Sequence, residues 1–115
     1  MLKHKNRLKQ KKDFEKVFKR GSNFRSKFLV LRTAKNKNKE VRFGIVVSHK
    51  VSKLAVDRNR IKRIIREAVK PYIDNMKGLD VVFVTLPGIK NKEAAQIRDG
   101  VIDLLKHSKL LKIKP

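Results

Sequence analysis

Cysteine is absent from this sequence of 115 residues. The chain therefore has neither a disulfide framework nor a thiolate metal site, which fits a reducing compartment. Long apolar runs are absent as well: no segment approaches the length of a membrane span, and the lysine-rich N-terminus lacks the apolar stretch of a secretory signal. We therefore expect a cytoplasmic protein with no membrane partner.

Acidic residues are scarce: 10 Asp and Glu stand against 32 Lys and Arg, which gives a formal net charge of +22. This excess is far beyond what solubility requires, and it favours a polyanionic partner. At this length we expect a single domain, residues 1–115, with one surface that carries the function. Lysine is densest near the start and in KNKNKE at 35–40; we expect a mobile basic arm at 1–10 and a hairpin loop at 35–40.

Patterns that carry catalysis are also missing. The carboxylates do not cluster as a metal-dependent nuclease requires, and Asp99 with Asp103 is better explained as a solvated pair near lysines. His4, His49 and His107 lie far apart, and the chain has no P-loop, no dinucleotide-binding glycine motif and no serine with an evident base. We predict no catalytic residue in this chain; any metal site on it is left unknown.

The most informative segment present is AVDRNRIKRIIREAV, residues 55–69. Its apolar residues follow the spacing of an amphipathic helix: Ile61, Ile64, Ile65, Ala68, Val69 and then Tyr72. Polar and basic residues gather on the other side: Asn59, Lys62, Arg63, Arg66 and Lys70, with Arg58 at the flank. An ordinary solvated face would mix charge signs, but only Asp57, the expected N-cap, and Glu67 oppose these cations. The pattern favours a surface that holds an anion.

The rest of the chain predicts an α+β fold. We expect a helix over 11–20, with Phe14, Val17 and Phe18 on one face and Gly21 as its cap. Segments 27–34 and 41–49 are expected to be antiparallel strands, and 80–86 a buried central strand. A last amphipathic helix carries Ala94, Ile97, Val101, Leu104 and Leu105, with Asn91 as its cap and Gly100 as a cost of roughly 1 kcal/mol. Helices would then pack on one sheet.

The two predicted neighbouring strands differ in their faces. In the segment 41–49, Val41, Phe43, Ile45 and Val47 alternate with more polar positions and form one core face. The segment 27–34 is apolar on both faces, so something must cover or use the second face.

Three motifs in register resemble those of the bacterial ribonuclease P protein component, the small basic subunit of a ribozyme that removes 5′ leaders from precursor tRNA. The Arg-Asn-Arg hallmark is supplied by Ala55, Arg58, Asn59, Arg60, Ile61, Lys62, Arg63 and Arg66. A second motif appears as Asp13, Phe14, Phe18 and Gly21, and a third as Arg42, Gly44, Val47, Ser48 and Lys50. The resemblance covers residues 7–107.

The resemblance implies a fold and two binding surfaces. The fold is a four-stranded, mostly antiparallel sheet packed with helices in two layers, with a further short strand within 22–26 and a left-handed βαβ crossover around the Arg-Asn-Arg helix. The catalytic RNA would be bound by Arg58, Asn59, Arg60, Lys62, Arg63 and Arg66. The precursor-tRNA leader would be bound by Phe14, Phe18, Leu29, Leu31, Val46 and Lys50. In this assignment Leu29, Leu31 and Val46 share one sheet face, Phe18 is partly core, and Phe14 is more exposed.

Two positions depart from the pattern of the family. Many relatives carry a Tyr near Leu31, and a lysine is common where this chain has His49. The expected function is that of the protein subunit of ribonuclease P, with the RNA subunit and precursor tRNA as partners. Phosphodiester cleavage is assigned to the RNA and to Mg²⁺ that the RNA holds, while the protein reduces the repulsion between the two polyanions.

Two other classes share part of this pattern. A ribosomal or other structural RNA-binding protein would have the same size and charge but would co-sediment with ribosomal subunits. An autonomous ribonuclease would cut precursor tRNA without added RNA, and the missing catalytic site argues against it.

Overall fold

The computed structural model describes residues 8, 11–20, 22–36, 40–76 and 78–108. The elements follow in the order α1 (Lys11–Arg20), β1 (Ser22–Arg25), β2 (Leu29–Lys35), β3 (Arg42–Val46), α2 (Ala55–Val69), η2 (Lys70–Met76), β4 (Leu79–Thr85), η3 (Pro87–Asn91) and α3 (Ala94–His107). Across these described ranges no helix is long and apolar enough to span a bilayer.

One four-stranded sheet, in the order β1-β2-β4-β3, organises the chain. β2 pairs antiparallel with both β1 and β4, and β3 pairs parallel with β4. The α+β class, the mostly antiparallel sheet, the short strand at 22–26 and the central place of 80–86 are thus confirmed. The chain from β3 through α2 to β4 is a crossover between parallel strands; its left-handedness stays a prediction.

The loop prediction at 35–40 was wrong. β4 lies between β2 and β3, so these two strands run antiparallel but do not pair, and the chain between them is no hairpin turn. Residues 37–39 of that segment lie outside the described residues. The local sequence predicts β2, β3 and a polar connection between them, but it does not show that β4, which follows later in the chain, inserts between the two strands.

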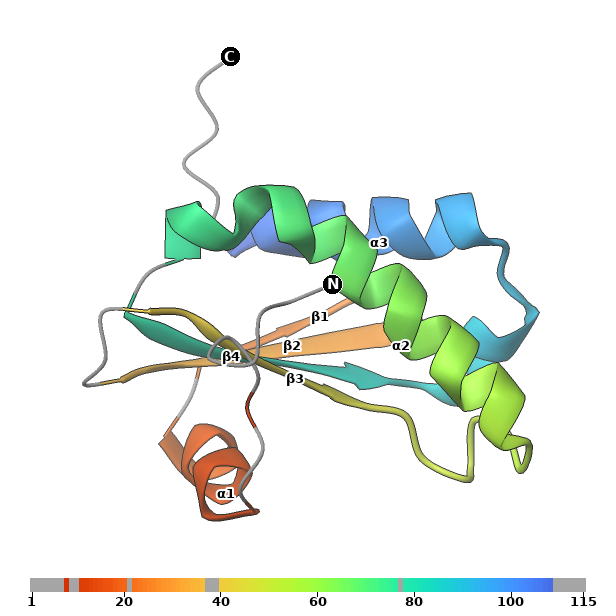
Figure 1. The fold of residues 1–115 in the computed structure, drawn as a ribbon, viewed down its shortest axis with the longest axis horizontal. Coiled ribbons are helices and arrows are strands. Elements are labelled where there is room, and N and C mark those ends of the chain that lie inside the picture. Colours follow the sequence, from red (N-terminus) through yellow and green to blue (C-terminus); the bar gives the residue numbers. More distant parts are fainter. Residues whose placement is uncertain (1–7, 9–10, 21, 37–39, 77, 109–115) are drawn as a thin grey trace.

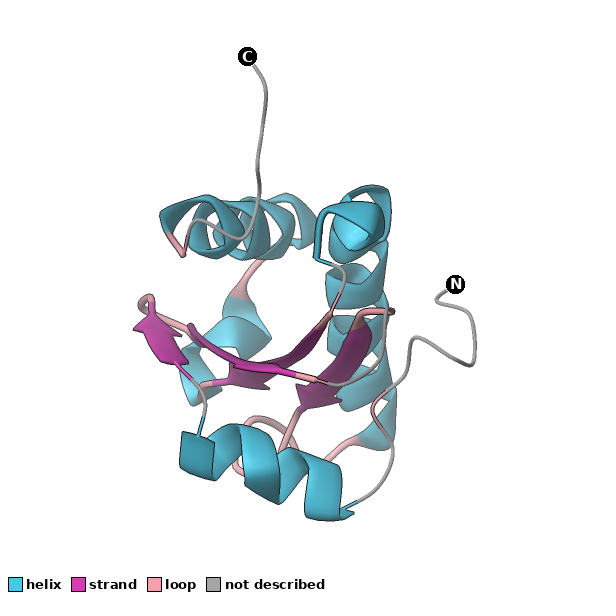
Figure 2. Cartoon of the chain, turned by 90° about the vertical axis from the view of Figure 1, so that its left-hand side faces the viewer, coloured by secondary structure: helices cyan, strands magenta, loops and turns pink. Residues whose placement is uncertain are grey.

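Helices cover both faces of the sheet (Figures 1 and 2). α2 and α3 lie together over one face, above the main apolar core, and α1 lies alone over the other. Between α1 and the sheet, a smaller cluster forms from Leu8, Val17 and Val82. The two-layer expectation therefore describes the sheet with α2 and α3, and α1 adds a third layer. The arm predicted at 1–10 lies outside the described residues except for Leu8, which is buried and donates its N–H to the carbonyl of Phe43.

The start of α2 differs from the predicted cap. The stripe of Ile61, Ile64, Ile65, Ala68 and Val69 is buried as expected, but the N-cap is Leu54. Asp57 lies inside the first turn and accepts a hydrogen bond of 2.9 Å from the hydroxyl of Ser52. Asp57 therefore still places negative charge at the positive end of the helix dipole, without being the cap.

The cap of α3 was also predicted at the wrong residue. Asn91 ends η3, and Glu93 is the N-cap of a capping box completed by Gln96. The backbone N–H of Glu93 donates to the Gln96 side chain at 2.9 Å. The sequence carries the usual spacing of this motif, but with Glu in place of the Ser or Thr that normally opens it.

Two glycines permit close packing between layers. A Cβ at Gly44 on β3 would collide with the ring of Phe14, so this glycine admits the α1 side chain onto the sheet. A Cβ at Gly100 on α3 would lie 2.8 Å from Cζ of Phe28. Gly100 thus lets Phe28 pack closely against α3, and this contact offsets the low helix propensity of glycine.

Candidate nucleic-acid interface

The outer side of α2 is strongly basic. Its inner side is filled by the buried apolar stripe, so the intervening polar side chains are directed outward. Asn59 and Arg63 are exposed, and the other expected contacts are partly exposed: Arg58, Arg60, Lys62 and Arg66. The structure therefore brings all six predicted RNA-contacting residues onto one helix with accessible surface.

Arg58 differs from its neighbours because the chain before α2 holds its guanidinium. It donates a hydrogen bond of 2.9 Å to the carbonyl of Ser52, and the same nitrogen lies 3.5 Å from Nδ1 of His49. His49 and Lys50 are exposed in the turn between β3 and α2. Arg58 is thus pre-positioned at the start of the helix, beside His49 and shortly after Lys50 in the chain.

The two aromatic residues of α1 have the reverse of the expected exposure. Phe14 is half-buried because its ring occupies the space left by Gly44, whereas 39% of Phe18 is exposed. Phe18 is therefore the α1 ring with more surface available for a base.

The expectation that Leu29 and Leu31 bind the leader was wrong about their face. Both side chains are fully buried in the main core beneath α2 and α3, so they present no surface to a ligand. Val46 does lie on the α1 face, packed against the smaller cluster of Val82. Since successive side chains of a strand alternate between faces, β2 presents Val30, Arg32 and Ala34 toward α1. Because apolar residues occupy alternate positions on both faces of β2, the sequence did not indicate which face is buried under α2 and α3.

Arg32 is the functional candidate that the sequence reasoning missed. Its guanidinium carbon lies 5.1 Å from the centroid of the Phe18 ring, and its Nη1 donates to the Phe18 carbonyl at 3.2 Å. An arginine among the apolar residues in the first half of this strand was the available signal for a functional side chain. The guanidinium thus lies over one face of the exposed Phe18 ring, and this cation–aromatic pair suits an unpaired base with its phosphate.

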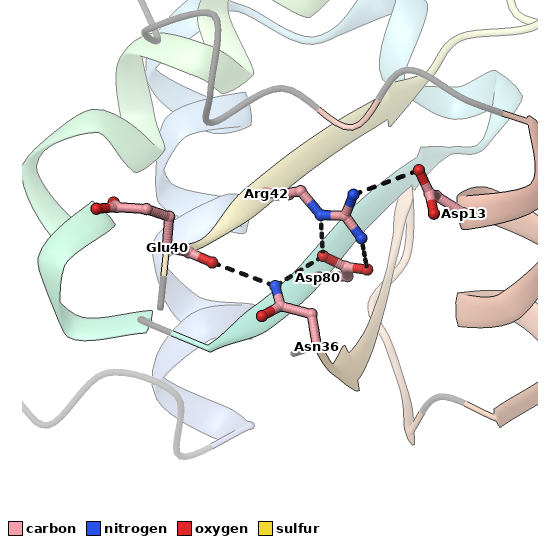
Figure 3. Close-up of polar contacts among 5 residues, drawn as sticks. All are labelled: Asp13, Asn36, Glu40, Arg42 and Asp80. Carbon is pink, nitrogen blue, oxygen red and sulfur yellow. Dashed lines mark hydrogen bonds and ion pairs between the residues drawn. The ribbon is translucent and has the colours of Figure 1, made fainter. Parts of the chain in front are cut away.

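A polar network ties α1 to the sheet (Figure 3). Arg42 donates two hydrogen bonds of 2.8 Å to the buried carboxylate of Asp80, and a third, of 3.3 Å, to Asp13 on α1. The hydrogen bond with Asp80 raises the pKa of Arg42 above its usual value. Asn36 also donates to Asp80 at 2.8 Å, so the buried carboxylate is well satisfied. Asp13 and Arg42 therefore position α1 against the sheet.

Within the described ranges no three His, Cys, Asp or Glu side chains lie close enough to hold a metal ion together. Lys50 is exposed in the turn that precedes α2. Its expected contact with the leader stays a prediction.

The fold and its basic helix define a small α+β domain built to bind nucleic acid. The family model for ribonuclease P matches residues 2–109. The ribonuclease P protein component of Clostridioides difficile is 40% identical over 103 residues, which cover 88% of this chain and 90% of that protein. That of Brevibacillus brevis is 40% identical over 111 residues, covering 95% and 87%. This chain belongs to the ribonuclease P protein family.

Solved structures agree with this assignment. The RNase P protein of Staphylococcus aureus matches with a TM-score of 0.86 at 32% identity, over 91% of this chain and 96% of that one. The RNase P protein of Thermotoga maritima matches with a TM-score of 0.77 at 28% identity, over 95% and 98%. The α+β architecture described above is therefore the architecture of the family.

Proposed function

We propose that this chain is the protein subunit that binds the catalytic RNA of ribonuclease P through α2 and the 5′ leader of precursor tRNA along the α1 face. The observation that carries the proposal is the construction of α2, whose inner side is entirely committed to the core while its outer side offers a row of cations. A cytoplasmic location belongs to the same proposal, because bacterial precursor tRNA is made there.

The α2 surface suits a folded RNA. A guanidinium can bind phosphate oxygens in a bidentate way and can also stack on a base, whereas a lysine acts as a point charge. Arg58, Arg60, Arg63 and Arg66 share the helix with one lysine, Lys62. Because Arg58 is already held by Ser52, it loses less conformational freedom on binding.

The α1 face suits a single strand. Phe18 and Arg32 provide a stacking surface beside a cation, and Phe14 and Val46 lie deeper against the sheet. Stacking on an aromatic side chain contributes roughly 1–3 kcal/mol per base and tolerates any base. In this proposal Arg32, Phe14, Phe18 and Val46 contact the leader, while Leu29 and Leu31 support the sheet from the other side.

The cleavage step is assigned to the RNA subunit with the Mg²⁺ that it binds, and the protein acts by holding two RNAs together. At a net charge of +22 the chain offsets the repulsion between catalytic RNA and substrate. The requirement for Mg²⁺ should therefore be lower when the protein is present.

The test is cleavage of a 5′-labelled precursor tRNA at near-physiological salt and low Mg²⁺. Three reactions are compared: the protein alone, a bacterial catalytic RNA alone, and both together. We expect a product at the mature 5′ end only in the combined reaction. Cleavage by the protein alone would make it a nuclease in its own right, and no effect of the protein on the RNA would remove the subunit role.

A further inference from the structure

A pocket that is lined by no residue of α1 or α2 has no part in the function proposed above. It has a volume of about 440 Å³ and is lined by Arg25, Ser26, Lys27, Phe28, Gly100, Asp103, Leu104 and His107. It therefore lies where the turn from β1 to β2 meets the C-terminal half of α3. β1 and β3 are the two edge strands of the sheet, so this β1–α3 pocket lies at the opposite edge from the crossover, on the face that α2 and α3 cover. Its volume is within the range of small-ligand sites.

The floor of the β1–α3 pocket is apolar and aromatic. Gly100 lets the ring of Phe28 approach α3, since a Cβ there would lie 2.8 Å from Cζ of that ring. Leu104 is buried beside it. Lys92 places its ammonium 5.9 Å from the centroid of the Phe28 ring, so the ring already takes part in a cation–π contact. The half-buried Phe28 ring is therefore an aromatic surface on which a planar base can stack.

The rim of the pocket carries basic side chains from the end of β1 and the turn after it, and one acidic side chain from α3. Arg25 is exposed at the end of β1, Lys27 is exposed on the turn that follows, and His107 is exposed at the end of α3. The His107 ring meets Phe24 edge-on, with centroids 6.5 Å apart. Asp103 is the only acidic residue of the lining and is exposed on α3. Cations at the rim suit phosphates, whereas a carboxylate beside the aromatic floor suits a hydrogen-bond donor.

We propose that the β1–α3 pocket binds one unpaired RNA nucleotide, with the base on Phe28 and Leu104, an exocyclic amine donating to Asp103, and the adjoining phosphates on Arg25 and Lys27. An acidic side chain accepts well from the amine of cytosine or adenine, while uracil presents a carbonyl oxygen at that position. The pocket is therefore selective for an amine-bearing base. This inference rests on the proposed function only in taking an RNA as the partner.

The first experiment uses the free, full-length chain and two five-residue RNAs, one of cytidine and one of uridine, in a ¹H–¹⁵N NMR titration. We expect saturable shifts at the amides of Phe28, Gly100 and Leu104, with cytidine binding at the pocket several-fold more tightly. Asp103→Asn should weaken cytidine binding at these amides roughly three- to tenfold and remove the preference over uridine. Asp99→Asn, one turn earlier on the same exposed side and outside the lining, is the matched control and should behave as wild type.

Results that overturn the inference are equally specific. Shifts confined to α1 and α2, or equal affinities for the two RNAs in wild type and Asp103→Asn, would mean that the pocket does not read a base. Because the readout is local, general electrostatic binding elsewhere on the chain does not imitate it.

The second experiment uses the assembled ribonucleoprotein and identifies which RNA supplies the nucleotide. Arg25→Ala with Lys27→Ala is compared with Arg98→Ala, a change of an exposed arginine on α3 outside the lining. Lost affinity for precursor tRNA, but not for leaderless tRNA, would assign the nucleotide to the leader; lost affinity for the catalytic RNA would assign it there. No loss in either measurement overturns the inference, while stimulation of cleavage by the wild-type chain continues to support the function proposed above.

Discussion

Arg42 and Asp80 form a bidentate pair in which two nitrogens of the guanidinium donate to the two carboxylate oxygens, each at 2.8 Å. Asp80 is the second residue of the central strand β4 and only 2% of it is exposed, so its charge depends on partners within the chain. The third contact of Arg42, to Asp13, extends this pair to α1. A single side chain thus links the parallel strands β3 and β4 to the helix that covers the smaller cluster.

The contact of Arg42 with Asp80 should contribute more to the free energy of unfolding than its contact with Asp13. Arg42→Ala leaves the buried Asp80 without its main counter-charge, and we expect a loss of roughly 3 kcal/mol in the free energy of unfolding. Asp13→Ala removes a longer, partly exposed contact and should cost less than about 1 kcal/mol. Urea unfolding of the two variants measures the difference. Equal losses would mean that the contact with α1, rather than the pair with Asp80, carries the stability.

The packing of Phe14 onto Gly44 is a second specific relationship. Gly44→Ala should displace the Phe14 ring and lower the free energy of unfolding by roughly 1–3 kcal/mol, because the core below α1 would be overpacked. Phe14→Leu in the same chain should recover part of that loss, since a smaller side chain gives space to the new methyl group. A double-mutant cycle by thermal unfolding checks this coupling. Additive losses would place Phe14 away from Gly44.

The RNA-binding role of α2 predicts a change in salt dependence. Arg63→Ala with Arg66→Ala should weaken binding to the catalytic RNA and reduce the slope of log affinity against log salt by about one unit for each lost phosphate contact. Arg98→Ala with Lys106→Ala, two exposed cations on α3, is the matched control for the loss of two positive charges. A slope that falls equally in the control would show that only net charge matters, and an unchanged slope would move the contact off α2.

The sequence predicted those features that depend on one element at a time. The bounds of the helix at 11–20, the buried stripe of α2 and the burial of β4 follow from local spacing, and all three were confirmed. The features that it missed depend on a partner distant in the sequence. The insertion of β4 between β2 and β3 and the approach of Phe28 to Gly100 are relationships of this kind.

The error about β2 has the greatest functional consequence. A strand that is apolar at both parities can face either layer, and only α2 and α3, packed on the sheet, select Leu29 and Leu31 for the main core. The opposite parity then brings Arg32 beside Phe18, which the apolar pattern alone did not suggest.

This corrected face yields a prediction that separates binding from stability. Phe18→Ala should lower the affinity of the assembled enzyme for leader-bearing precursor tRNA by roughly 1 kcal/mol, because Phe18 is 39% exposed and offers an aromatic surface to a base, and it should leave leaderless tRNA unaffected. Leu31→Val, in the core, should instead cost roughly 1 kcal/mol in the free energy of unfolding and leave the affinity for the leader as in wild type. Equilibrium binding with the two tRNAs, beside thermal unfolding of each variant, measures both effects. If Leu31→Val weakened leader binding and Phe18→Ala did not, the leader would lie on the face that α2 and α3 cover, contrary to the burial of that face.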